Sequence, residues 1–249
     1  MGLGGMVRRL GRYLGVPASS RFRLLGPDRP PATPGDGWDS PRVAQRQDAA
    51  WRSLLDQMRA GHPRNDMLAL RDALLASGLR APSLLEVGCG SGYYSEILSH
   101  LVSPMLRYAG VDRSAAMLNL ARQHYPSIPF VRGDAVRLPF AARAFDIVLN
   151  GNALMHILDT DAAVAESVRV ARTWCVFHTV PTLEGRPDQY LKKSVYGEAV
   201  TEVVLDQARL EGLFGRHGLT IRARYPSIPH PYLDPLVGKT RTWTYLCGN

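Results

Sequence analysis

The sequence predicts an α/β fold in which a mostly parallel β-sheet has helices on both faces. Two observations predict it. From residue 83 onward, short apolar runs alternate with helical patterns. The first of these runs leads into a glycine-rich loop that a helix follows. The chain has 249 residues, 45% of them apolar, so it can bury a full core.

The expected elements follow one another along the chain. Apolar runs predict strands at 84–87, 107–111, 130–131, 145–149, 174–180, 219–225 and 240–247. Apolar residues at helical spacing predict helices at 94–100, 115–124, 162–170 and 205–217. We expect this α/β domain to span residues 81–249.

A helical segment, residues 38–80, precedes the domain. Ser40 and Pro41 fit the N-cap and first residue of a helix that ends near Gly61. Asn65 is expected to cap a second helix, which ends before Gly78. This pair of helices is either core packing at the domain edge or a lid over a site.

Residues 1–37 are expected to be a basic tail and linker. Residues 1–27 hold five arginines and no acid, and 27–37 are rich in proline and glycine. Three interpretations of the tail remain: a frayed end, a segment that contacts an anionic membrane, or a transit peptide. The tail lacks the continuous apolar core of a secretory signal.

Charge and cysteines limit the classes of function. The net charge of +8 permits nucleic acid or anionic lipid, but the sequence lacks basic–aromatic interleaving and any RNA module, so a nucleic-acid partner is disfavoured. The three cysteines, Cys89, Cys175 and Cys247, form neither a metal spacing nor a disulfide framework. We therefore expect no metal and a reducing, cytoplasmic location.

The glycine loop lies in the stretch SLLEVGCGSGYYSEIL, Ser83 to Leu98. Gly88, Gly90 and Gly92 alternate between strand and helix, which lets backbone N–H groups approach a ligand at the helix N-terminus. The dinucleotide pattern needs a glycine where this chain has Tyr93, and a phosphate-binding Gly-Lys-Ser/Thr ending is absent. The loop is therefore neither of these nucleotide motifs.

Polar residues lie at the ends of the next three expected strands. Asp112 can accept both hydroxyls of a ribose. Asp134 can accept the amino hydrogens of an adenine, while the N–H of Ala135 meets a ring nitrogen, and Asn150 ends the fourth strand. Each residue alone is more often a helix cap, but four successive strand ends carry the expected groups.

Together these residues resemble the class I S-adenosylmethionine-dependent methyltransferases, most of all the type 11 small-molecule subgroup. The resemblance implies a Rossmann-like fold with a seven-stranded, mostly parallel sheet and a C-terminal antiparallel strand, and it implies S-adenosyl-L-methionine as cofactor. It also implies a methionine pocket at the glycine loop, ribose binding by Asp112, adenine binding at Asp134, and a segment from Asn150 to Ala153 under the reactive methyl. The implied cofactor-binding residues are Glu86, Gly88, Cys89, Gly90, Gly92, Tyr93, Asp112, Arg113, Met117, Asp134, Ala135, Asn150 and Gly151. The stretch RVARTWCVFHTV departs from the family, which usually has a proline and two glycines there.

The methyl acceptor is expected to be a small molecule, such as an envelope sugar, a lipid or a secondary metabolite. The segment NGNA after the fourth strand lacks the proline motif that enzymes acting on nucleobase amines carry. Residues 181–202 and 225–238 are expected to form the acceptor side, or else to be solvated loops. The alternatives are an RNA-directed methyltransferase and a non-catalytic cofactor-binding protein.

Two histidines are candidate catalytic bases. His178 ends the fifth expected strand, and His156 lies one helical turn past Asn152. Methyl transfer needs an aligned nucleophile and, for a hydroxyl, removal of its proton, a step that histidine often performs. The alternative role for either histidine is a hydrogen bond that holds a loop.

Overall fold

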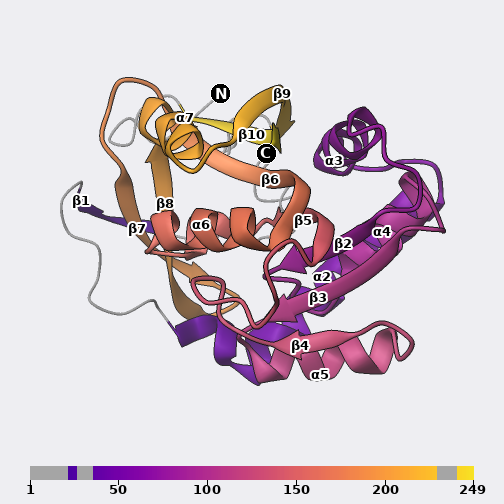
Figure 1. Ribbon diagram of the computed structural model, residues 1–249. Helices are drawn as coiled ribbons and strands as arrows, with labels where there is room; N and C mark the ends of the chain where they lie inside the picture. The colour runs from indigo at the N-terminus through magenta and orange to yellow at the C-terminus, as the bar shows by residue number, and fades with distance from the viewer. Residues whose placement is uncertain (1–21, 27–35, 229–239) are drawn as a thin grey trace.

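The structure is a computed structural model that describes residues 22–26, 36–228 and 240–249 (Figure 1). Its strands are β1 (Phe22–Gly26), β2 (Ser83–Val87), β3 (Arg107–Asp112), β4 (Phe130–Arg132), β5 (Phe145–Gly151), β6 (Ala171–Leu183), β7 (Gln189–Val195), β8 (Glu198–Asp206), β9 (Thr220–Ile228) and β10 (Thr240–Gly248). Its α-helices are α2 (Pro41–Arg59), α3 (Asn65–Ala76), α4 (Tyr93–Leu101), α5 (Ala115–His124), α6 (Thr160–Val170) and α7 (Gln207–Arg216). Two short 3-10 helices are η1 (Asp36–Asp39) and η2 (Leu154–His156).

The central part of the sheet has the strand order β4-β3-β2-β5-β6-β10-β9. The five strands from β4 to β6 are parallel, and β10 is antiparallel to both of its neighbours. These seven strands confirm the predicted fold class, including the C-terminal antiparallel strand. Since the parallel strands all point the same way, their carboxyl ends meet at one edge of the sheet.

Alternating residues of the strands feed two hydrophobic cores, one on each face of the sheet. Leu85 and Val87 of β2 belong to the core that α6 and α7 cover. Leu84, the residue before Leu85, points to the opposite face and belongs to the core under α2, α3, α4 and α5. Both faces are therefore buried, as a parallel sheet with crossover helices requires.

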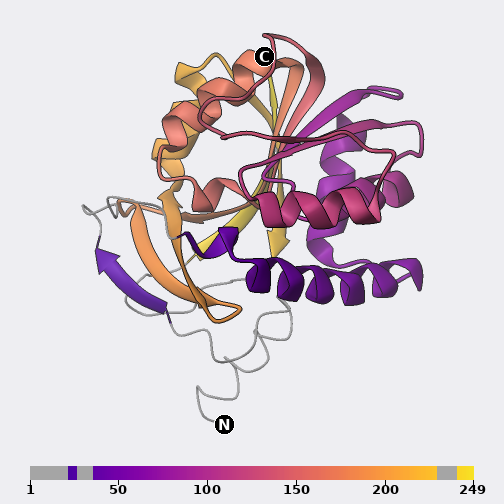
Figure 2. The same ribbon diagram turned by 90° about the horizontal axis from the view of Figure 1, so that it is seen from below.

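The two N-terminal helices have different positions. α3 packs against β9 and β10, at the edge of the sheet, whereas α2 contacts α4, α5 and η1 and runs along the side of the domain seen in Figure 2. The N-cap of α3 is Arg64, and Asn65 is already its first residue, so the expectation that Asn65 caps this helix is wrong by one position.

The sequence patterns did not predict a β-hairpin in residues 181–202. β6 continues past the end of β5 to Leu183, and there it pairs in parallel with the end of β8. β7 and β8 then form an antiparallel hairpin, and β1 adds to β7 from within the segment expected to be tail and linker. The expected acceptor-side loop 225–238 begins inside β9, and its residues 229–238 lie outside the described residues.

Candidate active site

A cavity of about 380 Å³ opens at the carboxyl ends of β2, β3, β4 and β5. Its volume lies in the range typical of small-molecule sites. Of the residues predicted to bind the cofactor, this larger cavity is lined by Gly88, Gly90, Tyr93, Asp112, Arg113, Met117, Asp134, Ala135 and Gly151. The sheet edge thus brings together residues from four separate segments of the chain.

The glycine loop forms one wall of the larger cavity. Gly88 and Cys89 both donate backbone hydrogen bonds to the carbonyl of Val111, at 2.8 and 3.1 Å. A Cβ atom on Gly88 would lie 2.4 Å from the Cβ of Ala153, and the φ angle of Gly88 is +73°. A side chain at this position has no space, so the loop presents its backbone to the cavity.

Asp112 holds the glycine loop and also lines the cavity. One carboxylate oxygen accepts a hydrogen bond from the N–H of Gly90 and the other from the N–H of Ser114, both at 2.8 Å. Burial raises the pKa of Asp112 above its ordinary value, although these two hydrogen bonds oppose the shift. Asp134, in contrast, is exposed and accepts a bond from the N–H of Val136 at 3.1 Å.

The other predicted cofactor residues lie behind the cavity wall and are not among its described lining residues: Glu86, Cys89, Gly92 and Asn150. Glu86 is fully buried, receives a hydrogen bond from the Tyr108 hydroxyl, and has a pKa raised well above its ordinary value by burial. A Cβ atom on Gly151 would lie 2.2 Å from Glu86 Oε1, so this carboxyl group sets the position of the β5 end. Asn150 donates to the hydroxyl of Ser167 on α6, at 3.0 Å.

His156 is the last residue of η2, and it lines the larger cavity. Its Nδ1 is 3.0 Å from the carbonyl oxygen of Thr201 in β8, and its ring meets Trp38 edge-on with centroids 4.9 Å apart. A carbonyl only accepts, so Nδ1 carries the hydrogen and Nε2 has a free lone pair. Burial lowers the pKa of His156, which favours the neutral ring.

His178 has a different environment. It is fully buried, its Nδ1 is 2.8 Å from Thr244 Oγ1 on β10, and its ring contacts Tyr94 edge-on. Among the described residues it lines neither the larger cavity nor the smaller one beside it. This position does not support the expectation that His178 contacts the acceptor, because the side chain of His178 points into the core under α4.

The smaller cavity has a volume of about 110 Å³ and adjoins the larger one. The two share the lining residues Trp38, Gln47, Asn152 and His156. Asn152 and Thr179 fix this junction: both have positive φ angles, 57° and 54°, and Thr179 Oγ1 donates to Asn152 Oδ1 at 2.7 Å. Such backbone strain in two neighbouring residues is typical of functional sites.

Several lining residues were not predicted from the sequence. Trp38 and Gln47 come from η1 and α2, and Thr201 comes from the hairpin that the patterns missed. Trp38 lies just before Ser40 and Pro41, which mark the start of a helix. This signal predicts the helix but does not predict which cavity Trp38 faces.

Comparison with known proteins relates the middle of the chain to one family and the fold to several solved structures. A family model described as a methyltransferase domain, of type 11, matches residues 85–177. The structure resembles that of Burkholderia thailandensis 1,6-didemethyltoxoflavin-N1-methyltransferase, with a TM-score of 0.57, 18% identity, and coverage of 93% of this chain and 96% of that one. It also resembles magnesium protoporphyrin IX methyltransferase from Synechocystis, with a TM-score of 0.53, 17% identity, and coverage of 79% and 83%. At these identities the likeness shows the fold.

Two curated relatives match the same part of the chain. The 2-phytyl-1,4-naphtoquinone methyltransferase of Thermosynechococcus vestitus is 36% identical over 89 residues, which are 34% of this chain and 40% of that protein. The phthiotriol/phenolphthiotriol dimycocerosates methyltransferase of Mycobacterium tuberculosis is 38% identical over 96 residues, 38% of this chain and 35% of that protein. The match thus spans about two fifths of the length of these relatives. Residues 85–177 match the type 11 methyltransferase domain, and the likeness to the solved methyltransferase structures shows that the chain has their fold.

Proposed function

We propose that this protein binds S-adenosyl-L-methionine in the larger cavity and transfers its methyl group to a small molecule in the smaller cavity. One observation carries the proposal: the two cavities meet at Asn152 and His156. A transfer between two bound molecules needs the donor and acceptor sites to touch at one point. When bound, the cofactor supplies an electrophilic methyl group on a sulfonium.

The residues of the larger cavity fit this cofactor. Gly88 and Gly90 leave room for its methionine part, because a Cβ atom on Gly88 would collide with Ala153. The oxygens of Asp112 each accept one backbone hydrogen bond and keep lone pairs for the ribose hydroxyls. Asp134 and Ala135 line the same cavity as Arg113 and Met117, and they are the proposed contacts of the adenine.

His156 is proposed as the general base. Its Nε2 has the lone pair, its Nδ1 is held by Thr201, and its lowered pKa keeps the ring neutral at pH 7. A neutral imidazole can accept the proton of an acceptor hydroxyl as the oxygen attacks the methyl group.

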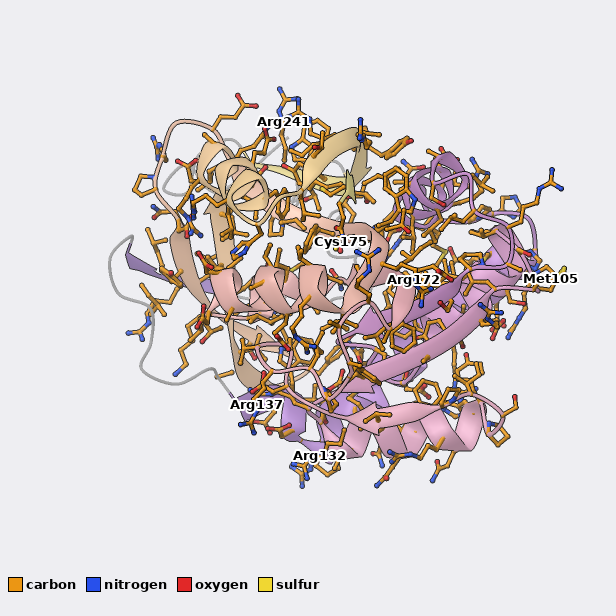
Figure 3. All side chains as sticks on the ribbon, in the orientation of Figure 1. Met105, Arg132, Arg137, Arg172, Cys175 and Arg241 are labelled. Atoms are coloured by element: carbon orange, nitrogen blue, oxygen red, sulfur yellow. The ribbon has the colours of Figure 1, made fainter. Side chains whose placement is uncertain are left out.

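The printed names of the curated relatives support a small-molecule acceptor, since they include naphthoquinone and phthiotriol compounds. Of the arginines labelled in Figure 3, Arg132 and Arg137 lie at the bottom of the view, Arg172 near its middle and Arg241 at its top. Within the described ranges, no helix is long and apolar enough to cross a membrane. The free, buried thiols of Cys89, Cys175 and Cys247 support the proposal of a cytoplasmic location.

The test is a screen of small-molecule acceptors with purified protein, read out as S-adenosylhomocysteine formed per enzyme. Formation that depends on one acceptor class supports the proposal. A salt-dependent gel shift with RNA, together with methylation of RNA only, would favour the RNA-directed alternative. Cofactor binding without transfer to any acceptor would favour the non-catalytic one.

A further inference from the structure

We infer that the smaller cavity selects an acceptor with one aromatic ring and two hydroxyl or amine groups on its edge. One group faces His156 and the other donates a hydrogen bond to Glu202. The inference rests on the proposed function and names the substrate class for it.

The size of the cavity sets the size of the acceptor group that enters it. Its volume is about 110 Å³. A cavity of about 150 Å³ is enough for benzene in an engineered protein interior. The smaller cavity is below that volume, so it accommodates at most one six-membered ring, which extends into the junction with the larger cavity. Any remaining part of the acceptor has to lie toward the open side.

Glu202 provides an unused hydrogen-bond acceptor in the wall. Its side chain is 2% exposed, and Oε2 forms an ion pair with Lys193 Nζ at 3.4 Å. Oε1 has no hydrogen-bond partner among the described residues, and neither has Thr242 Oγ1 in the same wall. Buried carboxylate oxygens are nearly always paired, so a missing partner here points to a donor on the ligand.

The hairpin connects Glu202 to the proposed base. Thr201 of β8 holds Nδ1 of His156, and Glu202 is the next residue along the strand. Both His156 and Glu202 line the cavity, so each can contact a different group on the edge of one ring. One strand therefore positions the base and also carries the proposed binding group.

The rest of the wall favours an aromatic ring over a sugar. Part of this wall is apolar, formed by Met155, Pro181, Val195 and Ile228, and hydroxyls of a sugar that faced these side chains would have no partners there. The cationic groups already have carboxylate partners: Arg64 pairs with Asp66, and Lys193 pairs with Glu202. Among the described lining residues, Glu202 Oε1 is the charged atom without a partner, and as an acceptor it selects a donor group on the ligand. The neutral atoms Trp38 Nε1 and Gln47 Oε1, also without partners in this wall, offer one donor and one acceptor.

The experiment measures binding by calorimetry to protein saturated with S-adenosylhomocysteine. The probes are phenol, the three dihydroxybenzene isomers, 2-aminophenol and benzoate. We expect at least one dihydroxybenzene or 2-aminophenol to bind about tenfold or more tightly than phenol, since a hydrogen bond to a charged group typically gives such a gain. Glu202→Gln is expected to reduce this preference about fivefold, and Glu198→Gln, at an exposed position of the same strand, to leave it unchanged.

Other results overturn the inference. These are equal binding of phenol and the dihydroxybenzenes, tightest binding of benzoate, no binding of any probe, or a preference that survives Glu202→Gln. If Glu202→Gln unfolds, the double variant Lys193→Met/Glu202→Leu removes both charges together and should abolish the preference. Binding of S-adenosylhomocysteine is measured first, so a failure of the proposed function is seen separately as a loss of that binding.

Discussion

Among the described residues, the ring of His156 makes one hydrogen bond, in which Nδ1 donates to the carbonyl oxygen of Thr201 at 3.0 Å. This bond fixes the tautomer, because a carbonyl cannot donate. It leaves Nε2 as the proton acceptor at the junction of the two cavities. The β7–β8 hairpin thereby contributes to the proposed chemistry through its backbone.

The first prediction concerns His156→Asn. We expect turnover to fall by about 10²–10⁴-fold if the acceptor is a hydroxyl, because the general base is lost. The dissociation constant of the cofactor should stay within about twofold, since no cofactor contact is assigned to Nε2. His100→Asn, at an exposed position in the last turn of α4, is the matched control. A stable His156→Asn variant with a near-normal rate would remove this residue from the mechanism.

The second prediction compares Asp112→Ala with Asp134→Ala. Asp112 is bonded to Gly90 and Ser114, so its loss removes the proposed ribose partner and releases the loop. Asp134 is exposed and makes one local bond. We expect Asp112→Ala to weaken cofactor binding by about tenfold or more, and Asp134→Ala by less. Titration calorimetry measures both, and equal losses in folded proteins would contradict the assignment.

The third prediction tests the close approach at the glycine loop. Gly88→Ala would place a Cβ atom 2.4 Å from Ala153, and overpacking of this kind typically costs about 1–3 kcal/mol of unfolding free energy. Gly185→Ala is the control: its φ angle of +68° is similar to the +73° of Gly88, but nothing described lies within 4 Å. Urea unfolding of both variants isolates the contact. A loss no larger for Gly88→Ala than for Gly185→Ala would show that the loop can move away.

The fourth prediction concerns His178 and acid stability. The pKa of His178 is lowered to about 4, chiefly by burial; Asp66 opposes this shift and Arg64 adds to it. Below pH 6.5 the unfolded chain takes up a proton that the folded protein does not, so stability falls between about pH 6.5 and 4. The shift corresponds to roughly 3 kcal/mol over this window.

His178→Leu should remove that part of the pH dependence. The unfolding free energy, measured by urea unfolding at several pH values from 7 to 4, is expected to fall less steeply for the variant than for the wild type. The carboxylates contribute equally to both proteins and cancel in the comparison. If the unfolding free energies of the variant and the wild type changed with pH in parallel, His178 would take up its proton in the folded protein as readily as in the unfolded chain.

The sequence predicts the parallel sheet and most of the strand-end residues that line the larger cavity, for physical reasons. Asp112 and Asp134 each follow a strand closely, so the pattern that predicts their positions lies within a few residues of the sequence. The acceptor side depends on long-range pairing. Thr201 reaches His156 only because β8 pairs with the far end of β6, and no local pattern encodes that pairing.

The histidines show the same limit. His156 follows one expected strand and His178 lies at the end of another. His178 is in the segment where β6 passes from the main sheet to the hairpin, and β6 is strained at Thr179. Which face His178 occupies depends on the pairing of β6 with β10 and on Tyr94 above it. The direction of one side chain in a strand depends on register, which a single sequence specifies weakly at such a bulge.

The measurement that tests the central claim most directly is titration calorimetry of S-adenosylmethionine and S-adenosylhomocysteine into the full chain. Our account predicts saturable binding of one molecule per chain, lost or strongly weakened in Asp112→Ala while the circular dichroism spectrum is kept. No saturable heat up to about 1 mM ligand, a concentration that detects even binding of about −4 kcal/mol, would contradict it.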